Sequence, residues 1–325
     1  MRRPARERGM ALLTVLLLVA VMAVVATALI DDVRFALRRA ANAETTAQAQ
    51  WYALGAEDLA RVEIAHLTQV DPRRTPLTPE WNGRPLNFPI EEGAIQATLS
   101  DGQACFNLNS LVEGEGETLN ARPQGAAQFT ALARTLGVGA GATLAAAVTD
   151  WIDSDQTPVA GGAEDGAYAG GRRPYRTSGT LLAEVSELRA VRGFDSATYV
   201  TLRPHLCALP TTDLSPINVN TLTEAQAPLL VMLSGGALGE GAARQVIVRR
   251  PAEGWTDVNA FWAEPLMAAV SPSDALYDQV TVRTRFFALE TRVTYADAEA
   301  VSTALLEAPL AGPVRTVARR WSLAE

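Results

Sequence analysis

The sequence predicts an α+β fold in which a long N-terminal helix packs on an antiparallel sheet and a large all-α insert interrupts that sheet. Three observations lead to this prediction. An apolar run without a charged residue spans 10–30 and continues into sequence that favours a helix. Patterns typical of strands lie near 86–99 and again at 280–295 and 314–323. The long stretch between them has the periodicity of helices, clearest over 124–210.

The apolar run 10–30 is long enough to cross a membrane. As a helix, its 21 residues span roughly 30 Å, the thickness of the hydrocarbon core. The preceding leader, residues 1–9, has four arginines and one glutamate, whereas Asp31 and Asp32 follow the run. The positive-inside rule therefore places the N-terminus in the cytoplasm and the rest of the chain on the other side of the membrane.

The helix should continue past the membrane, because residues 31–67 contain no proline and are rich in alanine, leucine, arginine, glutamate and glutamine. Spacings of three and four residues place one set of side chains on a single face: Tyr52, Gly55, Leu59, Val62 and His66. We expect this face to pack against the globular part of the protein.

The composition argues against an enzyme. The chain has no lysine, which excludes Schiff-base and P-loop lysine chemistry. Its two histidines, His66 and His205, lie in no recognised nucleophile or metal motif. We interpret Asp297, Glu299 and Glu307 as a solvated face rather than as catalytic acids. The formal net charge of −8 also disfavours nonspecific binding to nucleic acid.

An acidic, glycine-rich loop is the strongest candidate for a binding site. Asp153 and Asp155 flank a serine, and Glu164 and Asp165 follow a run of small residues. These four carboxylates can converge on a hard cation, and calcium is the expected ion. The carbonyl of Gln156 is a possible further ligand. The spacing is not that of an EF-hand, and a solvated acidic turn is the alternative.

The two cysteines, Cys105 and Cys207, lie far apart in the sequence. An exported compartment favours disulfides, so we predict that the two are paired. Two isolated buried thiols are the alternative, because spacing alone does not show that they are close in space.

A second class of function is suggested by residues 216–221 and 229–241, which together resemble a helix-hairpin-helix module, with 188–206 as a weaker copy. Such modules hold duplex phosphates at a glycine-rich hairpin and a helix N-terminus. Charge could come from Arg244, Arg249 and Arg250. Because the hairpin carries Glu240 and the ectodomain is acidic, a role in protein packing is favoured over DNA binding.

The N-terminal features resemble those of type IV pilins and type II secretion pseudopilins: a basic leader that ends in Gly9, an apolar helix that begins at Met10, and an amphipathic continuation. The resemblance implies that a prepilin peptidase cuts between Gly9 and Met10. Most members of that family have glutamate as the fifth mature residue, where this chain has Thr14. The missing glutamate is typical of minor pseudopilin K, the GspK family, whose calcium-binding insert also has the D-x-D and G-A-E-D pattern found at 153–165.

This resemblance implies a minor pseudopilin at the tip of the periplasmic pseudopilus, where it helps to initiate assembly for protein export across the outer membrane. The implied partners are minor pseudopilins I and J, other pseudopilins through the N-terminal helix, the prepilin peptidase, and the secretin or exported substrates. The implied location is the bacterial inner membrane, as a single-pass protein with a periplasmic ectodomain. The alternatives are a minor pilin of a type IV pilus-like system and a membrane-anchored DNA-binding protein.

The expected domain limits follow from the same resemblance, which implies a pseudopilin fold. They are leader 1–9, transmembrane helix 10–30, periplasmic part of that helix 31–70, first part of the α/β domain 71–110, helical insert with two helix-hairpin-helix-like segments 111–279, and C-terminal strands 280–325.

Overall fold

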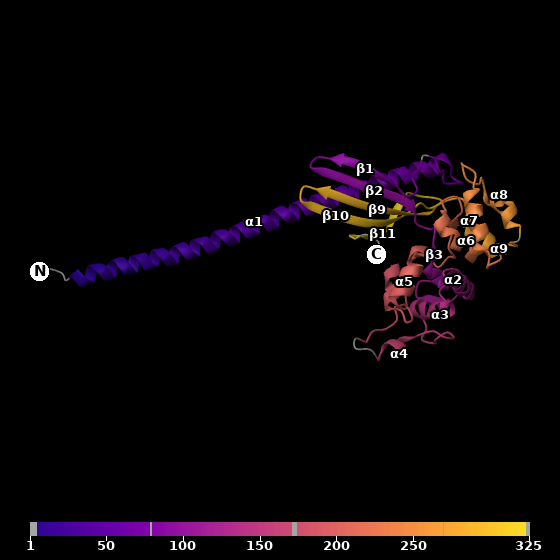
Figure 1. The fold of residues 1–325 in the computed structure, drawn as a ribbon, viewed down its shortest axis with the longest axis horizontal. Coiled ribbons are helices and arrows are strands. Elements are labelled where there is room, and N and C mark those ends of the chain that lie inside the picture. Colours follow the sequence, from indigo (N-terminus) through magenta and orange to yellow (C-terminus); the bar gives the residue numbers. More distant parts are fainter. Residues whose placement is uncertain (1–4, 79, 171–173, 269, 323–325) are drawn as a thin grey trace.

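Residues 5–78, 80–170, 174–268 and 270–322 are described by the computed structural model. Figure 1 shows a long helix, α1 (Ala5–Val70), whose C-terminal part lies against a sheet, with a helical region beyond it. The sheet has five strands in the order β1-β2-β9-β10-β11, and every neighbouring pair is antiparallel. The predicted α+β fold is confirmed.

The helical region is inserted between two neighbouring strands of this sheet. The five strands are β1 (Arg84–Ile90), β2 (Gly93–Asp101), β9 (Phe286–Tyr295), β10 (Ala298–Glu307) and β11 (Arg315–Arg320). The chain leaves the sheet at the end of β2 and returns at β9, which pairs with β2 along its length. The insert therefore begins at the end of β2 and ends at the adjacent start of β9, where Asp101 pairs with Phe287.

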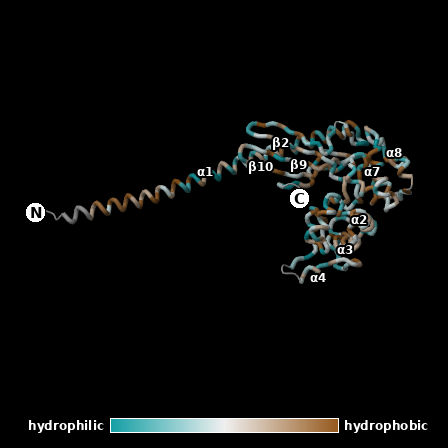
Figure 2. Tube along the Cα trace, viewed as in Figure 1, coloured by the Kyte–Doolittle hydropathy of each residue, from teal (hydrophilic) through white to brown (hydrophobic). Residues whose placement is uncertain are grey.

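The N-terminal part of α1 extends beyond the sheet and is exposed to solvent. Figure 2 shows that its N-terminal part is strongly hydrophobic, and its side chains are exposed from residue 10 to residue 44. It is the one helix among the described residues that is long and apolar enough to cross a membrane, with a mean hydropathy of 2.9 in its most apolar window.

The face of α1 that packs on the sheet is mostly not the predicted one: of the five predicted residues, Tyr52 lies against Tyr295 of β9, with ring centroids 5.6 Å apart. The buried side chains are mostly small: Ala49, Ala53, Ala56, Ile64 and Leu67. Leu59 and Val62, which were expected to be buried, remain 62% and 68% exposed. Alanines allow the helix to approach the sheet closely, and the periodicity of large apolar residues does not show what covers them.

Of the three acidic residues that we interpreted as a solvated face, one is buried in the structure. Asp297 and Glu299 are exposed, as expected, but Glu307 at the end of β10 is buried. Its carboxylate oxygens lie 2.6 Å from an Arg285 nitrogen and 2.7 Å from an Arg315 nitrogen. Interpreting Glu307 as part of a solvated face was therefore wrong, because two arginines from neighbouring segments compensate its charge.

The insert consists of two copies of one module. The first contains β3 (Phe106–Asn107), β4 (Val112–Glu115), β5 (Thr118–Ala121), α2 (Pro123–Thr135), α3 (Gly141–Ile152), α4 (Asp165–Tyr168), α5 (Ser196–Leu202) and β6 (Leu206–Cys207). The second contains β7 (Ile217–Asn218), α6 (Ala227–Leu233), α7 (Glu240–Val248), α8 (Val258–Trp262), α9 (Asp274–Gln279) and β8 (Val280–Thr281). Short 3₁₀ turns complete them: Leu108–Leu111, Val185–Ala190, Arg203–His205, Glu224–Gln226 and Pro265–Met267. Each copy begins and ends in a strand, and the two strands pair in parallel.

A buried asparagine makes the same contacts in both copies. Asn109 accepts a hydrogen bond from the Leu182 amide at 2.8 Å and donates to the Leu182 carbonyl at 2.9 Å. Asn220 binds both backbone groups of Trp255 at the same distances. Asn109 and Leu182 are 73 positions apart, whereas Asn220 and Trp255 are 35 positions apart. The acidic loop lies among the extra residues of the first copy.

We predict that Asn109→Ala and Asn220→Ala each destabilise the fold by about 1–3 kcal/mol, because each removes buried hydrogen bonds and leaves backbone groups unpaired. The measurement is the thermal unfolding of the full chain in detergent. Asn87→Ala is the matched control, since Asn87 lies on the exposed strand β1. Equal melting temperatures for all three variants would contradict the structural role given to the two buried asparagines.

Candidate metal centre

Three carboxylates meet where α3 ends and α4 begins. Asp150 lies in the last turn of α3, Asp153 is its C-terminal cap, and Glu164 precedes α4. One oxygen from each lies within 4.8 Å of the other two. All three residues are buried, with exposures of 0%, 3% and 8%. Three buried groups of like charge at this distance require a compensating charge.

Most oxygens of this cluster have no hydrogen-bond donor within the described part of the chain. The unpaired atoms are Asp150 Oδ2, Asp153 Oδ1 and both Glu164 carboxylate oxygens, while Asp150 Oδ1 accepts from the Val159 amide at 3.0 Å. A buried carboxylate without a partner is costly. Oxygen donors without protons are the ligands that a hard divalent cation prefers, so these residues fit such an ion.

The pKa values of the three carboxylates are raised because the groups are buried close together. Burial first, and then repulsion by neighbouring carboxylates, raises the pKa of Asp153 to about 7 and that of Glu164 to about 7. The pKa of Asp150 is also raised, mainly by burial. Without a cation, the cluster therefore holds protons near neutral pH.

The surrounding chain keeps the three carboxylates in place. A Cβ atom on Gly162 would lie 2.0 Å from Asp150 Oδ2, so only glycine allows the loop to pass this close to the carboxylate. Trp151, between two of the acidic residues in sequence, packs edge-on against Tyr168 at 5.4 Å between ring centroids. This contact joins α3 to α4 beside the cluster.

Of the predicted ligands, the structure brings Asp153 and Glu164 together and places Asp155 and Asp165 outside the three-residue cluster. Asp155 is exposed and accepts from the Thr157 amide at 2.6 Å. Asp165 Oδ1 accepts from the amide of Thr177 at 2.9 Å and from its hydroxyl at 3.0 Å. The exposed Gln156 donates its side-chain amide to the Asp155 carbonyl at 3.1 Å.

Asp150 was not among the predicted ligands, although a sequence signal exists. It precedes Asp153 by three positions, which places the two carboxylates on one face at the end of a helix. The ligand roles of Asp155, Asp165 and Gln156 remain predictions.

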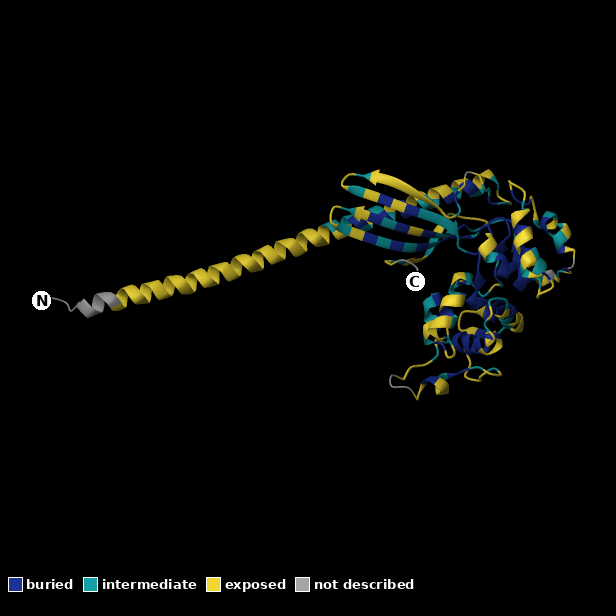
Figure 3. Cartoon of the chain, in the orientation of Figure 1, coloured by how far each residue is buried: buried dark blue, intermediate teal, exposed yellow. Residues whose placement is uncertain are grey.

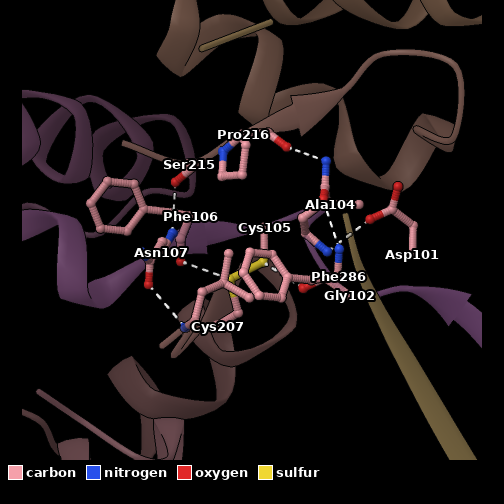
Figure 4. The surroundings of a disulfide bond; sticks show 12 residues. Asp101, Gly102, Ala104, Cys105, Phe106, Asn107, Cys207, Ser215, Pro216 and Phe286 are labelled. Carbon is pink, nitrogen blue, oxygen red and sulfur yellow. Dashed lines mark hydrogen bonds between the residues drawn. A yellow bond between two sulfur atoms is a disulfide. The ribbon is translucent and has the colours of Figure 1, made fainter. Parts of the chain in front are cut away.

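Cys105, the residue before β3, and Cys207, the last residue of β6, form a disulfide with their Cα atoms 5.7 Å apart (Figure 4). The bridge closes a loop of 102 positions that contains nearly all of the first copy and the acidic cluster. Closing a loop of this length restricts the unfolded chain and stabilises the fold by up to about 4–5 kcal/mol in the loop-entropy description.

In the segment that resembles a helix-hairpin-helix module, amides of the hairpin donate hydrogen bonds within the chain. The N–H groups of Gly235 and Gly236 donate to carbonyls at the end of α6, and that of Ala237 donates to the Ser234 carbonyl, all at 3.0–3.1 Å. Two of the three candidate arginines are also engaged. Arg244 lies 2.6 Å from Glu240, and the partly buried Arg250 donates to the Leu222 carbonyl at 2.7 Å. These three amides and two of the three candidate arginines are therefore already engaged within the chain.

A membrane-length helix is followed by a sheet packed on its far end and by an acidic helical insert, and these three parts can be compared with known proteins. Two profiles described as type II secretion system protein K match residues 104–211 and 217–283, which correspond to the two copies in the insert. The type II secretion system protein K of Pectobacterium carotovorum subsp. carotovorum is 36% identical over 93% of both chains, and that of Klebsiella pneumoniae is 38% identical over 86% of this chain and 87% of its own. The chain belongs to the type II secretion system protein K family.

A solved structure shows the same fold. In the crystal structure of the GspK-GspI-GspJ complex from enterotoxigenic Escherichia coli, one chain superposes with a TM-score of 0.76 and 31% identity. The match covers 87% of this chain and 99% of that one.

We predict that the chelated protein becomes less stable as the pH rises from about 5 to about 8. Asp153 and Glu164 have raised pKa values, so they bind protons more tightly in the folded chain than in the unfolded one. Their stabilising contribution is complete below the unfolded pKa values and is lost as the pH passes about 7. The measurement is the melting temperature against pH in a chelator, and Asp153→Asn should flatten the profile. A variant with the wild-type slope would contradict this account.

Proposed function

We propose that this chain is a minor pseudopilin at the tip of the periplasmic pseudopilus of a type II secretion system, where it helps to initiate assembly for protein export across the outer membrane. The observation that carries the proposal is the structural match to a chain of the GspK-GspI-GspJ complex, which extends over 87% of this protein. Minor pseudopilins I and J are therefore the proposed partners. The proposed role is one of assembly, and no catalytic step is assigned.

The proposed topology rests on the charge around the apolar run. The basic leader stays in the cytoplasm, residues 10–30 cross the inner membrane, and the remainder lies in the periplasm. A prepilin peptidase removes the leader between Gly9 and Met10. After cleavage, α1 anchors the subunit and packs among the helices of other pseudopilins.

Thr14 supports a terminal position in the filament. Cleavage leaves a charged amine at Met10 in an apolar setting, and such a charge needs a partner. In most type IV pilins and pseudopilins, the partner is the glutamate of a neighbouring subunit. Thr14 instead donates its hydroxyl to the Ala11 carbonyl of its own helix at 2.9 Å. A subunit of this kind provides no carboxylate for a further subunit, as a tip subunit requires.

We propose that the acidic cluster binds calcium. Asp150, Asp153 and Glu164 would hold the ion, and Asp155, Asp165 and the Gln156 carbonyl are candidates to complete its ligand set. A bound cation would neutralise the buried carboxylates and stabilise the long glycine-rich loop of the first copy, which is costly in entropy to order.

Two other functions receive less support. A minor pilin of a type IV pilus-like system would have the same α1 but generally lacks the insert. DNA binding is disfavoured by the internally bonded hairpin and the acidic charge. Contact with the secretin or with exported substrates remains part of the proposal that comes from the family resemblance.

The assembly role predicts that deleting the gene abolishes secretion and that the wild-type chain restores it. When coexpressed with its cognate I and J subunits, the full chain should purify from membranes with both. Gly9→Leu, which removes the residue before the cleavage point, should leave the leader attached and block this rescue. A chain that purifies alone and is not needed for secretion would contradict the proposed function.

The calcium proposal predicts stabilisation of the wild-type chain, by about 2.7 kcal/mol when free calcium is a hundred times its dissociation constant. Asp153→Ala should lose both this shift and the bound calcium measured by elemental analysis, because it removes a buried carboxylate. Asp297→Ala, in an exposed turn, is the control and should behave as the wild type. Equal calcium content in all three proteins would exclude this cluster as the site.

A further inference from the structure

A groove lies where the two copies of the insert meet, and we call it the seam groove. It consists of two adjoining hollows of about 730 Å³ each, which share Gln124 at the start of α2. The first hollow lies between α2, the hairpin after α6 and the start of α9, and the second continues along α9 to residues 213–216. Figure 1 shows the insert at the end of the molecule remote from the N-terminus. The groove is therefore separate from the part of α1 that spans the membrane.

The two copies are firmly joined beside the groove. Gln128 of α2 and Gln279 of α9 exchange hydrogen bonds between their buried side-chain amides, at 2.7 and 3.1 Å. Gln128 lines the first hollow and Gln279 lines the second. Buried apolar residues of both copies form one core, and Figure 3 shows buried segments where the copies meet. The walls of the groove are therefore in place before any ligand binds, as is usual for binding sites.

The walls of the first hollow are made of small and apolar residues. On α2, Gln124, Ala127, Ala131 and Arg134 follow one another at spacings of three and four residues, so they share one face. The rest of the lining is mostly apolar or small and includes Met232, Leu233, Ser234, Gly235, Val270 and Leu276. Small side chains let another backbone come close, and the apolar ones favour apolar groups in the ligand.

One end of this hollow carries an unpaired positive charge. Arg134 is the one charged side chain among the described residues that line it. Arg134 is exposed and forms neither an ion pair nor a side-chain hydrogen bond with any described residue. A Cβ atom on Gly236 would lie 3.5 Å from its Nη2 atom, so the guanidinium lies beside the glycine turn of the hairpin. A free guanidinium is suited to a carboxylate, which it binds through two parallel hydrogen bonds.

The second hollow has the opposite charge. Its described lining includes the carboxylates of Glu113, Asp213 and Asp278 and one arginine, Arg122. Arg122 compensates Glu113 at 3.2 Å, and Asp213 lies 4.0 Å from Arg285. Asp278 has no ion pair within the described part of the chain. This end of the groove therefore favours a cationic group.

The length of the groove favours a peptide over a small molecule. One hollow of this volume already has the size of a site for a drug-sized ligand, and here two adjoin. Gln124 and Arg134 are ten positions apart on α2, which corresponds to about 15 Å along the helix axis. An extended chain advances about 3.3 Å per residue, so roughly five residues cover this distance.

We propose that the seam groove binds an extended segment of another protein, in which apolar side chains separate an acidic residue from a basic one. The acidic residue pairs with Arg134, and the basic residue pairs with Asp278. The charges at the two ends set the direction in which the segment lies. This inference goes beyond the proposed function, because it assigns a binding site to the insert rather than to α1.

The test uses the full chain in its own cells, with a photoreactive diazirine residue in place of Gln124, which is exposed and shared by both hollows. Irradiation should join it to a different protein, and mass spectrometry should map the contact to a segment that contains an acidic residue. Ala127→Trp, which fills the first hollow, should lower the crosslinked fraction by on the order of tenfold, the change that about 1.4 kcal/mol produces. Arg134→Glu and Asp278→Arg should each do the same.

Matched control variants should crosslink as the wild type does. Ala197→Trp adds the same bulk on the exposed face of α5. Arg249→Glu reverses an exposed arginine that ends α7 and has no described ion pair, just as Arg134 lies in the last turn of α2. Asp297→Arg reverses an acidic residue in an exposed turn. Melting temperatures equal to that of the wild type would show that the variants are folded.

An exchange of charges is the decisive arm of the experiment. Arginine in place of the mapped acidic residue of the partner should restore crosslinking to the Arg134→Glu chain. The absence of a crosslink, a crosslink only to a second copy of this chain, or full crosslinking by Arg134→Glu would overturn the inference. Recovery of the I and J subunits is measured separately and should be unchanged in every variant. A wild-type chain that recovers neither subunit would contradict the proposed function and not this inference.

Discussion

The buried side chain of Gln103 joins the sheet to the helical insert. Its amide donates to the carbonyls of Pro216 and Arg283, and its oxygen accepts from the amides of Arg285 and Phe286. Figure 4 shows this region beside the disulfide. One side chain therefore binds the start of the second copy of the insert and the segment that returns to the sheet. Because a buried backbone group without a partner is costly, these four bonds fix where the insert leaves and rejoins the sheet.

Asp101 reinforces the same junction. Its carboxylate accepts hydrogen bonds from the hydroxyls of Thr221 and Thr284 and from the amide of Gln103. Burial raises its pKa to about 6, although each of these hydrogen bonds acts in the opposite direction. The residue thus remains a charged acceptor at neutral pH, compensated by dipoles rather than by a cation. The cluster at Asp150, Asp153 and Glu164 differs because most of its oxygens lack such donors.

The two copies of the insert share the same ends but differ in the length of the chain between them. Both keep the buried asparagine and the parallel strand pair, which close the module whatever lies between. The first copy has gained the disulfide and the long acidic loop, whereas the second connects α7 to Trp255 through a short turn. The fixed ends tolerate the longer loop because closure entropy increases only slowly with loop length.

The sequence by itself determined the elements whose signals are local. The uninterrupted apolar run and the absence of proline predicted α1, alternating patterns predicted β1, β2 and β9, and the acidic loop pointed to Asp153 and Glu164. Tertiary structure decided what depends on distant partners: Asp150 joined the cluster because α3 ends beside α4, and Glu307 was buried because two arginines reached it. It also decided that alanines, rather than Leu59 and Val62, face the sheet. Periodicity identifies an apolar face, but only the packed fold shows which surface covers it.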